Sequence, residues 1–286
     1  MIYRSKAGER RLRELYLAEL ASWPVPHDRR QVPTPEGETF VLSCGPADAP
    51  PLVLLHGSGS NSAQWLGRIA ELATYFRVHA VDIIGEPGLS APTRPDPATD
   101  RYASWLDAVL DHLGLDRTAI LGYSLGSWLA LDYATRRPER VDRLALSCPP
   151  GITKERKGYL LKALLLTPFG RWGKLRTVRM MLGPGLSTVD ETAVVARTVL
   201  MSKHYRYRSG DLPVFTDEVL GRLAMPVHVL IGELDVMWDT RIAARRLRTV
   251  LPHATVRLLP GTGHLVPTVP AELEFLTTTN AGRRHA

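Results

Sequence analysis

Gly122-Tyr123-Ser124-Leu125-Gly126 lies between an apolar stretch that ends at Leu121 and a helix-forming stretch that continues to Arg137. A serine hydroxyl can attack a carbonyl carbon only if it projects from the edge of a sheet. A tight strand-to-helix turn places it there by straining the backbone at the nucleophile. Glycines at both ends of the pentapeptide leave room for such a turn. The stretch therefore predicts a nucleophile at Ser124, and an ordinary turn capped by this serine is the alternative.

Short apolar stretches alternate with helix-forming stretches on both sides of this turn. Residues 52–55 are continuously apolar, as expected of a strand buried on both faces of a parallel sheet. Further strands are predicted near residues 32–34, 39–44, 78–82, 119–121, 141–147, 227–231 and 255–259. Helices are predicted near residues 61–74, 102–113, 124–137, 240–250 and 270–278. This alternation predicts an α/β fold with a mostly parallel central sheet and helices on both faces.

The alternation stops between residues 152 and 224, where the chain is helix-forming, broken by Gly and Pro, and has no buried-strand pattern. We therefore predict a core of residues 1–151 and 225–286, with a leading amphipathic helix at about residues 7–21, and a helical insertion at residues 152–224. The insertion holds 13 Lys and Arg against 6 Asp and Glu, so it carries the whole net charge of +7.

Composition narrows the class of protein without naming a function. The chain is 44% hydrophobic and 23% charged, which is typical of a globular protein. Charges in the first twenty residues exclude a secretory signal core, and the apolar runs are too short for the roughly 20 residues that span a bilayer. No stacking aromatics accompany the basic residues as in nucleic-acid-binding modules. We expect a cytoplasmic protein with free thiols at Cys44 and Cys148, no nucleic-acid partner and no membrane insertion.

A serine nucleophile needs a neighbouring base, most often a histidine that a carboxylate orients. Of the nine histidines, only His264 follows the last predicted strand in a glycine-bracketed loop, Pro260-Gly261-Thr262-Gly263-His264. His56 lies in a second glycine-rich loop. The other seven lie in predicted helices, strands or tails, where a packed or solvated imidazole is the simpler interpretation. His264 is therefore the candidate base.

The orienting acid is expected at the end of the strand that follows the insertion. Gly232-Glu233-Leu234-Asp235 occupies this place, and we assign Asp235. Glu233 and Asp239 are rivals, each with the alternative role of a solvated carboxylate or a helix cap. Serine, acid and histidine then follow one another in the chain order that accompanies a nucleophile turn of this kind.

Two backbone amides are candidates to stabilise the negative oxygen that develops on an attacked carbonyl. Leu125 follows the nucleophile at a helix N-terminus, where its N–H is free and the helix dipole favours an anion. The loop His56-Gly57-Ser58-Gly59-Ser60 offers the N–H of Ser58. Gly57 and Tyr123 are the candidate substrate contacts. Alternatives for the loop are a plain glycine turn or a phosphate site, although no GxxxxGK[ST] pattern follows it.

Five blocks of this sequence, in order, resemble the α/β-hydrolase superfamily, within it the esterase-like members with a helical cap. They are His56-Gly57, the turn from Asp82 to Ser90 with one extra residue between its glycines, the pentapeptide around Ser124, residues 232–235 and Gly263-His264. The resemblance covers nearly the whole chain. It implies a catalytic triad of Ser124, Asp235 and His264, no metal or organic cofactor, and a cap at residues 152–224 over the pocket.

The resemblance leaves the reaction open within the family. A serine at position 124 argues against haloalkane dehalogenases and epoxide hydrolases, which carry an aspartate there. Hydrolysis of a carboxylic ester through an acyl-enzyme is our leading interpretation. A thioesterase, acyltransferase, lyase or cyclase, or a small-molecule receptor without turnover, is the alternative. The apolar stretch LLKALLLTPFGRW (160–172) is expected to line the pocket. This lining favours a small-molecule substrate with an apolar acyl portion, and the basic insertion favours an acidic group on it.

Overall fold

The computed structural model describes residues 1–184 and 191–278, and it contains one eight-stranded sheet with the order β1-β2-β4-β3-β5-β6-β7-β8. The strands are β1 (His27–Val32), β2 (Thr39–Cys44), β3 (Pro51–Leu55), β4 (Arg77–Val81), β5 (Thr118–Tyr123), β6 (Val141–Ser147), β7 (Val227–Gly232) and β8 (Thr255–Leu259). β2 runs antiparallel to β1 and β4, and every other neighbouring pair is parallel. The prediction of a mostly parallel α/β sheet is confirmed.

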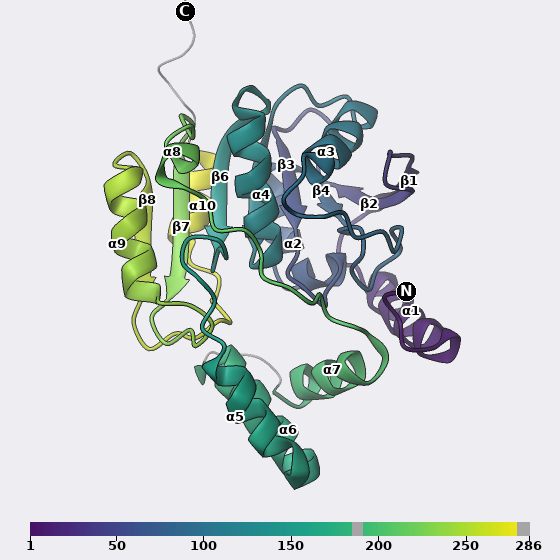
Figure 1. The fold of residues 1–286 in the computed structure, drawn as a ribbon. Helices are drawn as coiled ribbons and strands as arrows, with labels where there is room; N and C mark the ends of the chain where they lie inside the picture. The colour runs from purple at the N-terminus through teal and green to yellow at the C-terminus, as the bar shows by residue number, and fades with distance from the viewer. Residues whose placement is uncertain (185–190, 279–286) are drawn as a thin grey trace, which may run out of the picture.

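Helices cover both faces of the sheet (Figure 1). The α-helices of the described chain are α1 (Lys6–Ala21), α2 (Ile69–Tyr75), α3 (Arg101–His112), α4 (Leu125–Arg136), α5 (Gly158–Leu166), α6 (Gly170–Leu182), α7 (Glu191–His204), α8 (Asp217–Leu220), α9 (Thr240–Val250) and α10 (Pro270–Thr277). Apolar side chains of α3, α4 and α9 pack on one face, and those of α1, α2 and α10 pack on the other. The resulting three-layer core holds the carboxyl ends of the parallel strands at one edge, where the candidate site residues lie.

Two elements differ from their predicted bounds for local reasons. The first strand, β1, lies at residues 27–32 and not at 32–34, because Pro33 has no N–H to donate to a strand ladder. The predicted helix at residues 61–74 is split into a 3₁₀ helix, Ser62–Trp65, and α2. Asn61 starts the 3₁₀ helix by accepting the N–H of Ala63 at 3.2 Å.

The leading helix α1 is amphipathic, as its spacing predicted, and buries Leu12, Tyr16 and Leu20. Its N-terminus is capped by Ser5, whose Oγ accepts the N–H of Gly8 at 3.0 Å. The Tyr16 hydroxyl donates to the buried Asp82 Oδ1 at 2.8 Å. This bond ties the helix to the turn that follows β4.

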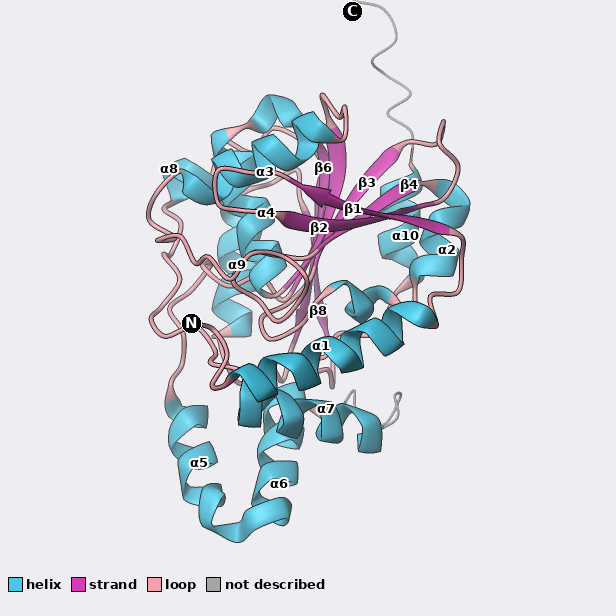
Figure 2. Ribbon diagram, turned by 90° about the vertical axis from the view of Figure 1, so that its right-hand side faces the viewer, coloured by secondary structure: helices cyan, strands magenta, loops and turns pink. Residues whose placement is uncertain are grey.

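The segment predicted as a helical insertion contains α5, α6, α7 and α8. Figure 2 shows α5 and α6 side by side, projecting away from the sheet. We refer to these two helices and the turn between them, residues 158–182, as the hairpin. Helix α7 lies against α1 instead, and residues 205–215 after it return along the core. In the described part of the chain, no helix is long and apolar enough to cross a bilayer.

Candidate active site

Ser124 lies in the connection between β5 and α4 with a backbone φ of 50° and ψ of −114°. A left-handed φ is costly for a residue with a Cβ, and such strain is typical of a nucleophile held at a sharp turn. The glycines on either side are required by close contacts. A Cβ at Gly126 would lie 2.0 Å from the carbonyl oxygen of Leu55, and one at Gly122 would lie 2.7 Å from the backbone of Gly126. The sequence pattern therefore reflects a real steric need.

The structure brings the three candidate residues of the relay together. The Nε2 of His264 lies 3.1 Å from the Oγ of Ser124, and its Nδ1 lies 2.6 Å from the Oδ2 of Asp235. The Asp235 and His264 side chains are buried, with residue exposures of 5% and 6%. Nδ1–H donating to the carboxylate leaves Nε2 free to accept the serine proton. This is the geometry that general-base activation of a hydroxyl requires.

Two opposing effects act on the pKa of His264. Burial lowers the pKa, because a charged imidazolium loses its hydration. The hydrogen bond and charge of Asp235 act in the other direction and prevail, so the pKa is raised above its ordinary value. Asp235 thus stabilises the imidazolium that forms when His264 takes a proton.

Asp235 itself is fixed by two further donors. Its Oδ1 accepts the N–H of Met237 at 3.0 Å, and its Oδ2 accepts the indole N–H of Trp238 at 3.1 Å. The two rival carboxylates are engaged elsewhere. Glu233 pairs with Arg241 at 2.9 Å, and Asp239 accepts the N–H of Ile242 at 3.1 Å as the N-cap of α9. Of the three acids, only Asp235 reaches the imidazole.

The two candidate oxyanion donors differ in their place in the fold, since Leu125 begins α4 and Ser58 lies in the loop after β3. The first main-chain bond inside α4 is donated by Trp128 to the Ser124 carbonyl, so the Leu125 N–H precedes the helical ladder. The N–H of Ser58 makes no hydrogen bond within residues 1–184 and 191–278. Both amides therefore retain a free donor.

His56 fixes the loop that carries Ser58. It is fully buried, its Nε2 accepts the N–H of Ile83 at 2.9 Å, and its Nδ1 donates to the carbonyl of Gly57 at 2.8 Å. Both ring nitrogens are used, which requires the neutral tautomer. Burial lowers the pKa of His56 and keeps it neutral.

Sequence reasoning missed Glu86, which lies beneath the same loop and is fully buried. Its Oε2 accepts the N–H of Gly59 at 2.7 Å, the Ser58 hydroxyl at 3.3 Å and the Tyr205 hydroxyl at 2.7 Å. Its Oε1 accepts the Nε of Arg208 at 3.1 Å. Glu86 thus joins the Ser58 loop to the chain that follows α7. The available signal was its place between the two glycines of the turn at residues 82–90, where the sequence has one residue more than the family pattern.

The two candidate substrate contacts have partners inside the protein. The N–H of Gly57 donates to the Oε1 of Gln64 at 3.0 Å. The Tyr123 hydroxyl donates to the carbonyl of His264 at 2.5 Å and accepts the N–H of Val266 at 3.3 Å. The structure therefore directs the Tyr123 hydroxyl to the loop that carries His264.

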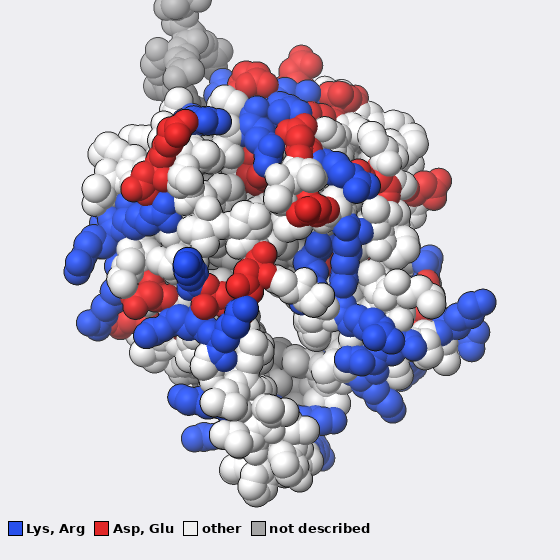
Figure 3. Space-filling view, in the orientation of Figure 1, with Lys and Arg blue, Asp and Glu red and all other residues white. Residues whose placement is uncertain are grey.

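A hollow of about 580 Å³ lies between the hairpin and the loop of Asp235. Tyr159, Lys162 and Met180 contribute from the hairpin, and Asp235 and Trp238 contribute from the core. Figure 3 shows that the surface opens between the hairpin and the body of the molecule. The hollow is thus lined by apolar side chains and by charges of both signs, which are Arg156, Lys162 and Arg241 against Glu233, Asp235 and Asp239.

The expectation that residues 160–172 line this pocket is wrong. The large apolar side chains of the stretch are exposed, with fractions from 49% to 67%. Among these residues, only Lys162 contributes to the hollow. Because α5 and α6 pack against each other, these apolar side chains lie on the outside of the hairpin and not against the core of the protein.

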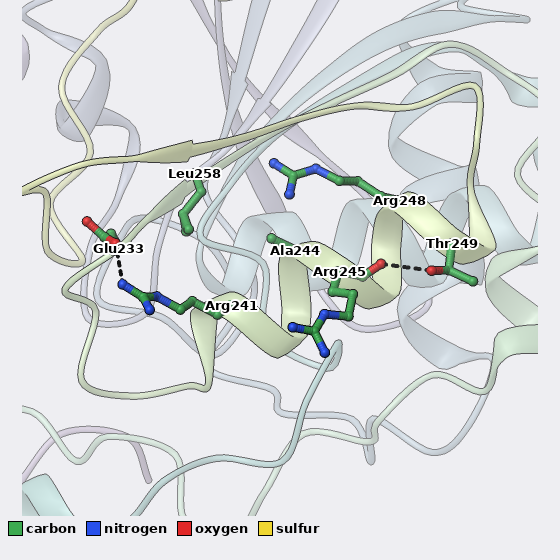
Figure 4. A pocket seen from close by; sticks show the side chains of 7 residues that line it. All are labelled: Glu233, Arg241, Ala244, Arg245, Arg248, Thr249 and Leu258. Carbon is green, nitrogen blue, oxygen red and sulfur yellow. Dashed lines mark hydrogen bonds and ion pairs between the residues drawn. The ribbon is translucent and has the colours of Figure 1, made fainter.

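A second hollow, of about 520 Å³, lies over the outer side of α9 and contains no member of the relay (Figure 4). Arg241, Arg245 and Arg248 line it, and Figure 4 shows Arg241 reaching Glu233. Arg248 donates to the carbonyl of Val256 at 2.9 Å. These contacts account for two of the three arginines.

Among the described residues, the side chains that could ligate a metal ion converge at the relay. One group converges closely enough to hold an ion, with ligand atoms of Cys148, Asp235 and His264 within 4.8 Å of one another. The last two already pair with each other at 2.6 Å. The Cys148 thiol donates to the His264 carbonyl at 3.5 Å, and both cysteines of the chain are free thiols. The donor set is therefore committed to orienting His264.

Comparisons with known proteins agree with this geometry. The family described as alpha/beta hydrolase fold matches residues 50–192. The chain is 31% identical over 261 residues to uncharacterized carboxylesterase nap of Bacillus subtilis, covering 88% of this chain and 86% of that protein. The crystal structure of carboxylesterase CesB (YbfK) from Bacillus subtilis matches with a TM-score of 0.79 and 28% identity, over 91% of this chain and 92% of the other. That of naproxen esterase (carboxylesterase NP) from the same organism matches with a TM-score of 0.77 and 29% identity, over 92% and 93%.

Proposed function

We propose that Ser124, Asp235 and His264 form the catalytic triad of this chain, which belongs to the alpha/beta hydrolase family. The chain is an ester hydrolase, since the relatives that it matches at 31% and 29% identity over most of its length are carboxylesterases. The observation that carries the assignment of the triad is His264, whose two ring nitrogens reach the Ser124 hydroxyl and the Asp235 carboxylate at once.

The first half of the reaction forms an acyl-enzyme. The Ser124 Oγ attacks the ester carbonyl carbon while its proton passes to the Nε2 of His264. The N–H groups of Leu125 and Ser58 stabilise the oxyanion, each by a few kcal/mol. The intermediate collapses by breaking the bond to the alcohol oxygen, which takes the proton from His264 and leaves as the alcohol.

The second half regenerates the enzyme. A water molecule gives a proton to the Nε2 of His264 and attacks the acyl carbon. When the second oxyanion collapses, the bond to the Ser124 Oγ breaks and this oxygen recovers its proton. Ester and water have then become acid and alcohol. Asp235 holds the imidazole in one tautomer throughout and stabilises its charged form.

We further propose a small-molecule ester with an apolar acyl portion and an anionic group as the substrate. Met180 and Trp238 supply apolar walls in the hollow beside Asp235. Of its three cations, Arg156 and Arg241 pair with Asp239 and Glu233, which leaves Lys162 as the cation without an ion pair among the described residues. A panel of neutral and anionic p-nitrophenyl esters of increasing acyl length tests this. Longer acyl chains and an acidic group should each raise kcat/KM, and equal rates across the panel would refute the specificity.

Covalent labelling tests the nucleophile directly. A fluorophosphonate probe should label the protein, and Ser124→Ala should abolish both labelling and hydrolysis of p-nitrophenyl acetate. Ser202→Ala, at an exposed serine of α7, is the matched control and should keep both. Labelling that survives Ser124→Ala would show that another residue is the nucleophile.

A further inference from the structure

The hairpin exposes a concentration of large apolar side chains that its fold does not use. We call six of them the hairpin tip: Leu160, Leu161, Leu164, Leu165, Phe169 and Trp172. Their exposed fractions lie between 49% and 67%. In the described chain, 13 large hydrophobic residues are exposed, and these six fall within thirteen consecutive positions. Such a patch on a soluble fold marks a contact surface.

The hairpin tip is a built surface. Four of its leucines lie on one face of α5, at positions i, i+1, i+4 and i+5. The buried Gly173 lets α6 lie close against α5, because a Cβ there would be 1.8 Å from the carbonyl oxygen of Leu166. Phe169 and Trp172 meet edge to face, with ring centroids 5.7 Å apart. The exposed face is therefore held in one shape.

Charge distinguishes the kind of partner. Residues 158–182 contain no Asp or Glu. Lys162, Arg171, Lys174 and Arg176 are exposed on the hairpin, and none of the four forms an ion pair within the described residues. In Figure 3 the projecting lobe is mostly uncharged, with Lys and Arg at its flanks and no Asp or Glu visible on it. A second copy of the chain would bring the same positive charges together, whereas an anionic surface would neutralise them.

We propose that the hairpin tip docks on an anionic lipid bilayer. The leucines and the two aromatic rings would enter the boundary between headgroups and acyl chains, where Trp and amphipathic helices gain the most. The four cations would contact lipid phosphates. Helices of 9 and 13 residues are too short to span the bilayer. If the proposal holds, shallow insertion of side chains replaces the expectation of no membrane insertion.

Docking also bears on substrate supply, and this part of the inference rests on the proposed function. Lys162 belongs to the docking surface and also borders the hollow beside Asp235. Docking would therefore bring the mouth of the hollow close to the lipid surface. Esters that partition into membranes, with an apolar chain and a polar or anionic head, are the substrate class that this arrangement favours.

Vesicle binding of the Ser124→Ala protein tests docking without hydrolysis. Co-sedimentation is measured with vesicles of phosphatidylcholine alone and with vesicles containing 30 mol% phosphatidylglycerol. Binding to the anionic vesicles should be at least tenfold stronger and should weaken as salt is raised. Absence of binding to anionic vesicles, or equal binding to both kinds at every salt concentration, would overturn the proposal.

Matched variants locate the binding surface. In the Ser124→Ala background, Leu164→Ser/Leu165→Ser/Phe169→Ser and, separately, Arg171→Gln/Lys174→Gln/Arg176→Gln should each weaken binding at least tenfold. Leu17→Ser/Ile242→Ser removes two apolar residues of similar exposure elsewhere and should leave binding unchanged. Circular dichroism and the melting temperature verify folding. If the control weakens binding as much as the tip variants do, the surface is wrongly placed.

The two proposals fail in different ways. Anionic-vesicle binding by a protein that the fluorophosphonate does not label would refute the triad and leave docking intact. Labelling and ester hydrolysis without vesicle binding would refute docking alone. A dimer that forms in solution and disappears in the tip variants would show that a second copy occupies the surface instead.

Discussion

The catalytic rim and the hairpin solve opposite physical problems. The catalytic rim consists of the loops that carry the site and the chain that supports them, residues 56–61, 82–90, 122–126, 205–208, 232–239 and 260–266. Its buried polar side chains are joined by hydrogen bonds; Glu86 accepts four and Asp235 accepts three. On the hairpin the hydroxyls of Thr167 and Thr177 donate to carbonyls of the preceding turn, and the six apolar side chains of the hairpin tip are exposed. Hydrogen bonds hold the side chains of the rim in a fixed geometry, whereas the hairpin presents an apolar surface that another molecule could contact.

The two regions meet at the foot of the hairpin. The N–H of Leu265 donates to the carbonyl of Leu182 at 3.0 Å, directly beside His264. Gly183 and Gly263 pack so closely that a Cβ on Gly183 would lie 2.5 Å from the Cα of Gly263. The hairpin is therefore attached to the rim at its base and free at its tip. Substitutions should separate these two kinds of region.

The largest expected effect is the loss of Asp235, the carboxylate that we propose orients the base. Asp235→Asn should lower kcat on the order of 10⁴-fold, because the wrong imidazole tautomer is then favoured. Asp235 raises the pKa of His264, and the reaction needs the neutral ring. Without Asp235 the pKa of His264 should fall. The acid side of the pH–rate profile of the residual activity should therefore lie at a lower pH than that of the parent enzyme. The pH profile of p-nitrophenyl acetate hydrolysis measures both effects.

The rival acid serves as the control for this substitution. Glu233→Gln removes a carboxylate from the same loop, but one that pairs with Arg241 at the surface. It should leave kcat and the acid side of the pH–rate profile unchanged. Equal losses in Glu233→Gln and Asp235→Asn would mean that the loop, and not the Asp235 contact, supports catalysis.

A pair of glycines compares the two regions by sterics alone. Gly126→Ala places a Cβ 2.0 Å from the Leu55 backbone in the core, which should cost about 3 kcal/mol and lower the melting temperature by about 10 °C. Gly173→Ala makes a closer contact, 1.8 Å from Leu166, but inside the hairpin. The melting temperature of the core should then change by less than about 2 °C. Equal shifts in calorimetry would show that the hairpin and core unfold as one unit.

Much of the rim could be predicted from the sequence because its signals are local. The predicted bounds of β2, β6, α9 and β8 match the structure. Apolar runs mark the strands and a helix cap marks α9, and both signals depend on residues that are close in sequence. The order of serine, acid and histidine narrowed nine histidines to His264. Gly122 and Gly126 indicated a sharp turn, and each avoids a backbone clash.

The remaining features depend on contacts between distant segments. The apolar stretch at residues 160–172 predicted a buried lining, because hydrophobic content alone does not say whether a partner surface is present. In the sequence Glu86 is only a carboxylate in a turn. Its contacts come from Ser58 and Arg208, which lie 28 and 122 positions away in the chain. Neither fact is visible in a local pattern.

Glu86 gives the next prediction, which tests how firmly the rim is held. Glu86→Gln keeps the shape but removes the charge opposite Arg208, and its amide would face donors of the Ser58 loop. We expect kcat to fall roughly tenfold, as a misplaced oxyanion donor requires, with KM nearly unchanged. Glu38→Gln, at an exposed position, is the matched control. A rise in KM at constant kcat would instead assign Glu86 to substrate binding.

The smallest expected effect concerns acid stability, and it belongs to the sheet. His228 in β7 stacks on Phe275 with ring centroids 5.3 Å apart, and burial lowers its pKa from 6.5 to about 4. The unfolded chain takes up this proton first as the pH falls. Stability should therefore decline between about pH 6.5 and pH 4, with no further loss from this group below that range.

His228→Leu removes the group that titrates, so the fall in melting temperature between pH 7 and pH 5 should shrink by a few degrees. The substitution breaks no hydrogen bond, since neither ring nitrogen has a partner in the described structure. His253→Leu, at an exposed position, should leave this fall unchanged. The hairpin contains no histidine, so vesicle binding should persist at pH 5 while the melting temperature falls. If vesicle binding weakened in step with the fall in melting temperature over this range, the docking surface would depend on the packing of the core. The contrast between the two regions would then not hold.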